Sequence, residues 1–190
     1  MKRTLLAFAA GLLAAGLVAA APREAAPAGE DIQLVATNGV AGKPNVTNSL
    51  DGRPVLTISN VQPGQSRTGQ VTLKNTGSAP ERVWVWQTAL TTGPAGRPDL
   101  SAWVRLSVYD SALARTVYVG PYNGFPPVDR PIQLCGVPTK KDACPSWAKG
   151  ESHTYTFTVT FPDAAAGSGV NVNSYQSTWL RSQLDWTSAI

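Results

Sequence analysis

The chain has 190 residues, of which 43% are hydrophobic, so it is long enough and apolar enough to bury the core of one domain of ordinary size. It carries 16 basic and 12 acidic residues, and the basic ones form no run and do not alternate with aromatic ones. This charge pattern argues against a nucleic-acid-binding protein.

The N-terminus has the pattern of a secretory signal peptide. Lys2 and Arg3 are followed by an uncharged run over 5–21 that ends in three alanines. We predict a cleaved signal over 1–20; the alternative is an uncleaved membrane anchor, which this short, Ala- and Gly-rich run fits less well. Without Lys2 and Arg3, 14 of the 16 basic residues remain against 12 acidic ones, a net charge of about +2. The mature protein is predicted to be secreted and to have no membrane span.

Residues 21–50 are predicted to form a flexible leader that contains one short strand. The stretch 22–30 is rich in Pro and Ala, and 37–52 is too rich in Asn, Gly and Pro to hold a regular element. Between them, 31–36 alternate in the manner of a strand, with one side formed by Ile32, Leu34 and Ala36.

From residue 54 onward the pattern is regular and all-β, and we assign 51–190 to one domain. The strand 153–161 alternates most clearly, with four threonines on one face and four apolar side chains on the other: Tyr155, Phe157, Val159 and Phe161. Further strands are predicted at 54–60, 67–75, 82–90, 103–109, 115–120, 132–135 and 179–186, and no helix is predicted after the signal. About eight strands with turns between them predict an antiparallel β-sandwich of jelly-roll type.

Two cysteines, Cys135 and Cys144, stand nine positions apart. In an exported protein such a pair is most simply a disulfide. A metal site would need further ligands, and the single histidine, His153, lies outside the loop that the cysteines enclose. Acidic residues such as Asp129 and Glu151 are scattered over turns, and the chain contains neither H-E-x-x-H nor G-x-S-x-G. We therefore predict no catalytic residue, metal or cofactor.

Six tryptophans are many for this length. Trp186 and one of Trp84 and Trp86 are predicted to fill the core or to cover loops. Trp103 and Trp179 fall opposite the apolar face of their predicted strands, so they are candidates for an exposed patch that binds a sugar or a protein.

Three segments resemble, in order, motifs of the TasA/camelysin family. VQPGQ at 61–65 with VTLKNTG at 71–77 is similar to its "L-x-P-G-D … v-x-N-x-G" region. KGES at 149–152 with YTFTVTFP at 155–162 resembles its "G-E-S-x-x-y-x-f-x-v-x-f-P" strand, and NSYQ at 173–176 resembles its "N-x-Y-Q-G" signature. Two features depart from the pattern, namely Ser177 in place of glycine and the Cys135–Cys144 loop, and they indicate a divergent member.

The resemblance implies a function. Members of this family are secreted proteins that build biofilm-matrix fibres and surface filaments from jelly-roll subunits, in which the N-terminal segment of one subunit pairs with an open sheet edge of the next. We therefore expect a head-to-tail homopolymer, in contact with other matrix or cell-surface components, in which Ile32, Leu34 and Ala36 are donated. Two alternatives remain open: the strand 31–36 pairs within its own sheet, or the protein is a monomeric binding module that uses its exposed tryptophans.

Overall fold

The computed structural model describes residues 30–36, 45–50, 52–59, 63–96, 99–139, 141–161 and 179–189. They form ten strands, one short α-helix and one 3-10 turn. In chain order these are β1 Glu30–Ala36, β2 Val46–Asn48, β3 Pro54–Ser59, β4 Ser66–Asn75, β5 Arg82–Gly93, α1 Leu100–Trp103, β6 Arg105–Asp110, β7 Arg115–Pro121, η1 Tyr122–Gly124, β8 Ile132–Leu134, β9 Ser152–Thr160 and β10 Trp179–Ala189.

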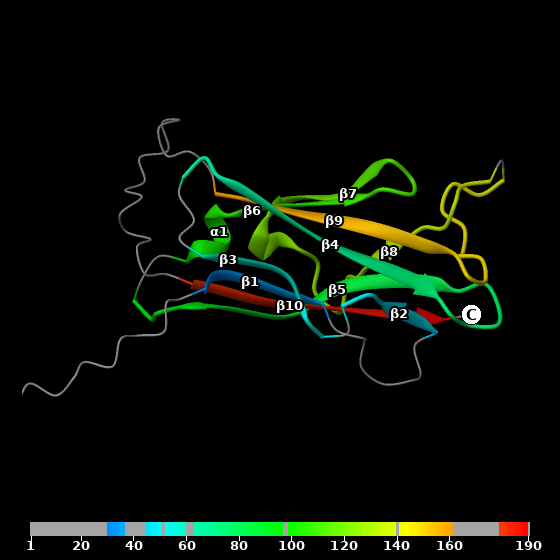
Figure 1. The fold of residues 1–190 in the computed structure, drawn as a ribbon, viewed down its shortest axis with the longest axis horizontal. Helices are drawn as coiled ribbons and strands as arrows, with labels where there is room; N and C mark the ends of the chain where they lie inside the picture. Colours follow the sequence, from blue (N-terminus) through cyan, green and yellow to red (C-terminus); the bar gives the residue numbers. More distant parts are fainter. Residues whose placement is uncertain are drawn as a thin grey trace, which may run out of the picture.

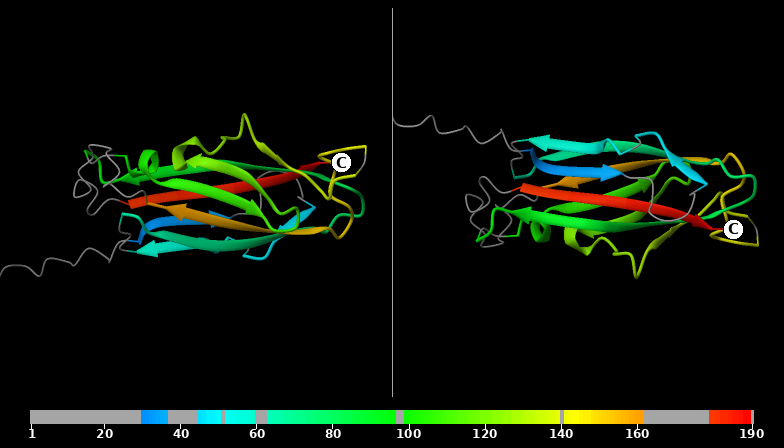
Figure 2. Two further views of the ribbon diagram at one scale, coloured as in Figure 1. Left: turned by 90° about the horizontal axis from the view of Figure 1, so that it is seen from above. Right: turned by 90° about the horizontal axis from the view of Figure 1, so that it is seen from below.

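The strands form two five-stranded sheets that face each other, as Figure 1 shows from the side and Figure 2 from above and below. The first sheet has the order β3-β1-β10-β5-β8, and the second β2-β4-β9-β6-β7. This confirms the predicted all-β sandwich, with ten strands in the described ranges rather than about eight. One pairing corrects the expected antiparallel arrangement, because β1 runs parallel to β10. The two strands come from distant parts of the chain, so no tight turn forces them to be antiparallel.

The core lies between the two sheets and is built from alternate residues of the central strands. In β9 the inward residues Tyr155, Phe157 and Val159 are each at most 3% exposed, whereas the threonines between them are half-buried on the outer face. Val71 of β4 and Val108 of β6 belong to the same core. The alternation of the sequence thus predicts which side of these strands is buried.

The tryptophans divide between the core and the outer surface. Trp186 is 1% exposed in the core, where the sequence predicts it. In β5 the core residues are Val83 and Val85. Alternation along this strand therefore places Trp84 and Trp86 on the outer face of the sheet, where Trp86 is nevertheless only 8% exposed.

Two short elements correct the predicted secondary structure. Residues Leu100–Trp103 form α1, and the strand expected to begin at 103 begins at Arg105 instead. The cause is the N-cap Asp99, whose carboxylate accepts a hydrogen bond from the backbone N–H of Ser101 at 2.9 Å. The strand β2 lies in a segment predicted to hold no element; it forms because Val46 is buried in the core, 1% exposed, while β2 pairs with β4.

The sheets approach each other very closely at Gly69 of β4, which follows the predicted turn at Pro63-Gly64. Gly64 has the positive φ, 79°, that this turn requires. A Cβ atom added at Gly69 would lie 2.0 Å from the backbone oxygen of Val55 in β3. Only a residue without a side chain fits between the two strands at this point.

We expect Gly69→Ala to lower the free energy of unfolding by about 1–3 kcal/mol, because the added methyl group forces the backbones of β3 and β4 apart. Urea denaturation monitored by tryptophan fluorescence would measure the change. The matched control is Thr68→Ala, at an exposed neighbouring position, which should change the stability by less than about 0.5 kcal/mol. Equal effects of the two substitutions would contradict the close approach.

Several predicted features lie outside the described residues. These are the signal peptide over 1–20 and the segment 173–177. The same holds for the side chains of Ile32, Ala36 and Trp179, whose backbones are described. Within the described ranges, no helix has the length and apolarity needed to cross a membrane.

Candidate functional site

The inner face of β9 carries a histidine at the start of its row of core side chains. Alternation places His153 on the same face as Tyr155 and Phe157, and His153 is 1% exposed. A buried imidazole needs a hydrogen-bond partner for each ring nitrogen, since an unpaired polar atom in the interior is costly.

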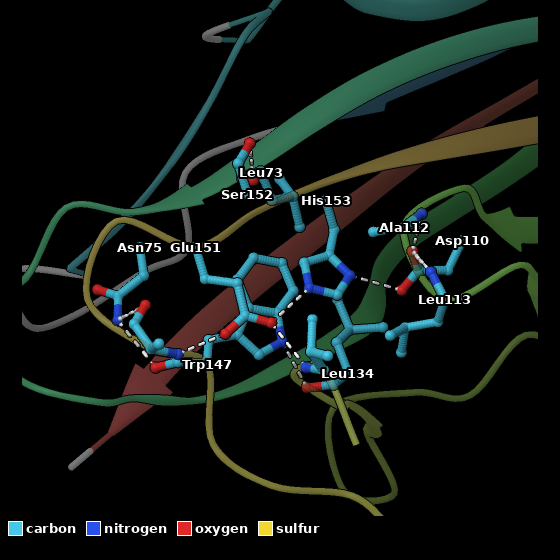
Figure 3. Close-up of polar contacts among 12 residues, drawn as sticks. Leu73, Asn75, Asp110, Ala112, Leu113, Leu134, Trp147, Glu151, Ser152 and His153 are labelled. Carbon is cyan, nitrogen blue, oxygen red and sulfur yellow. Dashed lines mark hydrogen bonds and ion pairs between the residues drawn. The ribbon is translucent and has the colours of Figure 1, made fainter. Parts of the chain in front are cut away.

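Two carboxylates supply these partners, and Figure 3 shows the arrangement. The Oδ2 atom of Asp110, at the end of β6, lies 2.8 Å from Nδ1 of His153, and Oε1 of Glu151 lies 2.8 Å from Nε2. The Asp110 side chain is 1% exposed and that of Glu151 13%. Ionised carboxylates only accept hydrogen bonds, so this geometry requires a hydrogen on both ring nitrogens, which is the imidazolium form. We call these three residues the Asp110–His153–Glu151 triad.

In the triad, each charged group favours the charged form of its partner and so offsets the cost of burying it. Burial alone lowers the pKa of His153, but hydrogen bonds and charge attraction from Asp110 and Glu151 outweigh it, so that the pKa of His153 lies above its ordinary value. Burial likewise raises the pKa of Asp110, but the hydrogen bond and charge of His153, together with the backbone N–H groups of Leu113 and Ala112, outweigh this effect, so that the pKa of Asp110 lies below its ordinary value.

Glu151 also fastens the loop that contains the disulfide. The structure contains the predicted bond between Cys135 and Cys144, with Cα atoms 4.6 Å apart. Oε1 of Glu151 accepts from the backbone N–H of Val137 at 2.8 Å, and Oε2 accepts from that of Ala148. The same carboxylate therefore binds the chain shortly after Cys135, the chain shortly after Cys144 and one nitrogen of His153.

Trp147 covers the triad from the loop side. Its ring stacks on that of His153 with centroids 4.3 Å apart, and its indole N–H donates to the carbonyl oxygen of Leu134 at 2.9 Å. Its backbone pairs in both directions with Glu81, and the side-chain amide of Asn75 donates to its carbonyl oxygen at 3.2 Å. Trp147 is fully buried, so the triad has little contact with solvent.

This arrangement fits a structural cross-link. Both nitrogens of His153 are engaged by carboxylates, and the ring is covered, so neither nitrogen is placed to exchange a proton with a bound molecule. In the part of the chain that the structure describes, no cluster of three or more His, Cys, Asp and Glu residues is arranged to hold a metal ion.

The other predicted site residues lie apart from the triad. Leu34, Ile32 and Ala36 all belong to β1. Leu34 is fully buried, and the backbones of Ile32 and Ala36 pair with β10. Trp103 is at the end of α1 and packs half-buried against the core, which corrects its prediction as an exposed side chain on a strand. Trp179 begins β10, away from Trp103 in the chain, and only its backbone is described.

The sequence contains one signal for the triad that the predictions did not use. His153 shares the predicted buried face of its strand with Tyr155 and Phe157, and a histidine on such a face requires partners. Glu151, expected to be one of the scattered solvated carboxylates, is two residues away and was the nearest candidate. Asp110 is 43 positions away, and only the pairing of β6 with β9 brings it near.

Comparisons with known proteins do not assign a family. No family model matches the chain, and no curated protein matches it. A search of solved structures finds a chain described as "AvmM Catalyzes Macrocyclization in Alchivemycin A Biosynthesis", with 14% identity and a TM-score of 0.35 over 77% of this chain and 89% of that one. A likeness at this level carries no argument about activity.

Proposed function

We propose that this protein is a secreted structural subunit of extracellular or surface fibres, assembled when β1 of one subunit is donated to the sheet of the next. The resemblance of its motifs to the TasA/camelysin family motivates this proposal, and the position of β1 supports it. The partner is a second copy of the same chain, and the site of action is the extracellular matrix or cell surface.

The supporting observation is that β1 fills an interior slot of the first sheet. It pairs in parallel with β10 on one side and antiparallel with β3 on the other. Leu34 is fully buried and belongs to the core. Withdrawal of β1 would leave two unpaired strand edges and a hole in the core, which together form a strong acceptor for another strand.

The segment between β1 and the second sheet has enough residues for β1 to be exchanged between subunits. In the single chain β1 fills its own slot, as the intrachain alternative states, and residues 37–44 connect it to the second sheet. Eight residues can span up to about 26–29 Å when extended. A neighbour's β1 would make the same contacts, so the exchange loses little pairing energy, and a head-to-tail exchange that does not close produces a fibre.

A disulfide lock tests this exchange. Gln33 of β1 is the register partner of Arg181 in β10, so the double variant Gln33→Cys, Arg181→Cys should form an intrachain bond when the monomer is oxidised. We expect the oxidised monomer to form no filaments by negative-stain electron microscopy, and the reduced protein to form them. Oxidation after assembly should link subunits covalently and give a ladder on a non-reducing gel.

The matched control places the lock elsewhere. Gln70 and Thr156 are register partners on the outer face of the second sheet, and their double cysteine variant should assemble whether oxidised or reduced. Filaments from the oxidised β1–β10 variant would overturn strand donation. An absence of filaments in all forms, wild type included, would overturn the fibre function itself.

A further inference from the structure

A preformed cleft lies at the edge of β5, beyond the end of β8, and neither the triad nor β1 contributes to it. Its volume is about 370 Å³, and it is lined by Gln87, residues 123–127 and Arg130. This volume falls in the range of small-molecule sites. No residue of β1, the strand donated in the proposed function, lines the cleft.

The walls of the cleft are fixed by the backbone and by packing. The N–H of Gln87 donates to the carbonyl oxygen of Pro126 at 2.8 Å, and that of Arg130 donates to Pro127 at 3.0 Å. Phe125 is 3% exposed and packs edge-on against Tyr118, with ring centroids 4.9 Å apart. A ligand would therefore meet a shape that exists before it binds.

The polar groups of the cleft are suited to an anion that also carries hydroxyl groups. Arg130 is well exposed, and the one carboxylate that pairs with it among the described residues, that of Asp129, stands 3.9 Å from its Nε atom, too far for a hydrogen bond. Arg130 and the exposed amide of Asn123 can both donate to a carboxylate. The Nε2 atom of Gln87 donates to the hydroxyl of Ser182 at 2.8 Å, which leaves its Oε1 atom as the acceptor available to a ligand.

The remaining lining is apolar. Phe125, Pro126 and Pro127 offer C–H and ring surfaces on which the C–H face of a saturated ring can pack. A simple anion such as phosphate would not contact this apolar surface, and a neutral sugar would offer no negative charge to Arg130. A sugar acid matches all three parts of the lining.

We propose that this cleft binds one uronate unit of an acidic polysaccharide. Its carboxylate lies at Arg130 and Asn123, a ring hydroxyl donates to Oε1 of Gln87, and its C–H face packs on Pro126 and Pro127. The fibre subunit would in this way hold matrix polysaccharide along its length. The binding does not depend on strand donation, so the two proposals fail separately.

Calorimetric titration of the full mature chain with trigalacturonate at low ionic strength tests the site. We expect saturable binding with one trimer per chain, and a loss of affinity on the order of tenfold in Arg130→Ala, the effect of one charge-assisted hydrogen bond. Asp129→Asn should tighten binding, because it removes the carboxylate that competes for Arg130. Arg67→Ala is the matched control, on β4 of the opposite sheet, and should bind as the wild type does.

Three results would overturn the proposal. One is the absence of saturable binding to the wild-type chain. Another is equal affinity of Arg130→Ala and Arg67→Ala for the trimer. The third is that maltotriose or acetate binds as tightly as trigalacturonate, which would show that the carboxylate or the sugar ring contributes nothing.

Discussion

Replacing Asp110 with alanine is expected to lower the free energy of unfolding by about 3–5 kcal/mol, the loss typical when one partner of a buried ion pair is removed. The substitution leaves His153 in the interior with one nitrogen unpaired. It also removes the acceptor for the backbone N–H groups of Ala112 and Leu113 in the turn between β6 and β7, at 2.9 and 3.2 Å. Urea denaturation at pH 6 would measure the change.

Two further variants separate charge from packing. Asp129→Ala removes a carboxylate that is 71% exposed and should change the stability by less than about 1 kcal/mol. Asp110→Asn keeps the size of the side chain and an acceptor oxygen, so it should cost less than Asp110→Ala. If Asp110→Ala were no more destabilising than Asp129→Ala, the triad would not contribute to stability.

The parts of the fold that follow from local pattern could be predicted from the sequence. The alternation of β9 determines its buried face, since one row of apolar residues must point inward. The Pro63-Gly64 turn and the disulfide follow from the chemistry of a few neighbouring residues. The short helix α1 was missed because one turn is too short for an apolar period, although Asp99 provides an N-cap signal.

Features that depend on distant pairings could not be predicted. The order of strands decides that β1 lies between β3 and β10 and that Asp110 lies beside His153. The candidate cleft likewise depends on Gln87 of β5 meeting the segment that follows η1. In each case the local sequence around the residue gives no sign of its role. The role depends on neighbours that only the order of the strands brings close.

The stability of the protein should vary with pH in two limbs, and the alkaline limb should belong to His153. Because the pKa of His153 is raised in the folded state, its stabilising contribution is complete below the ordinary imidazole value of 6.5 and is lost as the pH rises through the folded pKa. Each unit by which the folded pKa exceeds the unfolded one corresponds to about 1.4 kcal/mol.

The acidic limb has the opposite sign. Because the pKa of Asp110 is lowered, its contribution is complete above the ordinary carboxyl value of 3.8 and is lost as the pH falls through the folded pKa. Stability from the triad should therefore be greatest between 3.8 and 6.5. A further ionisable group near Asp110, Tyr155, does not interfere, because burial together with the charge of Asp110 raises its pKa above the ordinary value.

The assignment of the alkaline limb can be tested directly because His153 is the single histidine of the chain. Its ring C–H signals in an NMR titration should move with a pKa above 6.5, and the folded protein should become easier to denature with urea over the same range. In His153→Gln the neutral side chain does not titrate, so the alkaline loss of stability between pH 6 and 9 should disappear, even though the variant is less stable at pH 6. A histidine signal that titrates below 6.5, or an alkaline limb that persists in His153→Gln, would show that the two carboxylates do not hold the ring in its charged form.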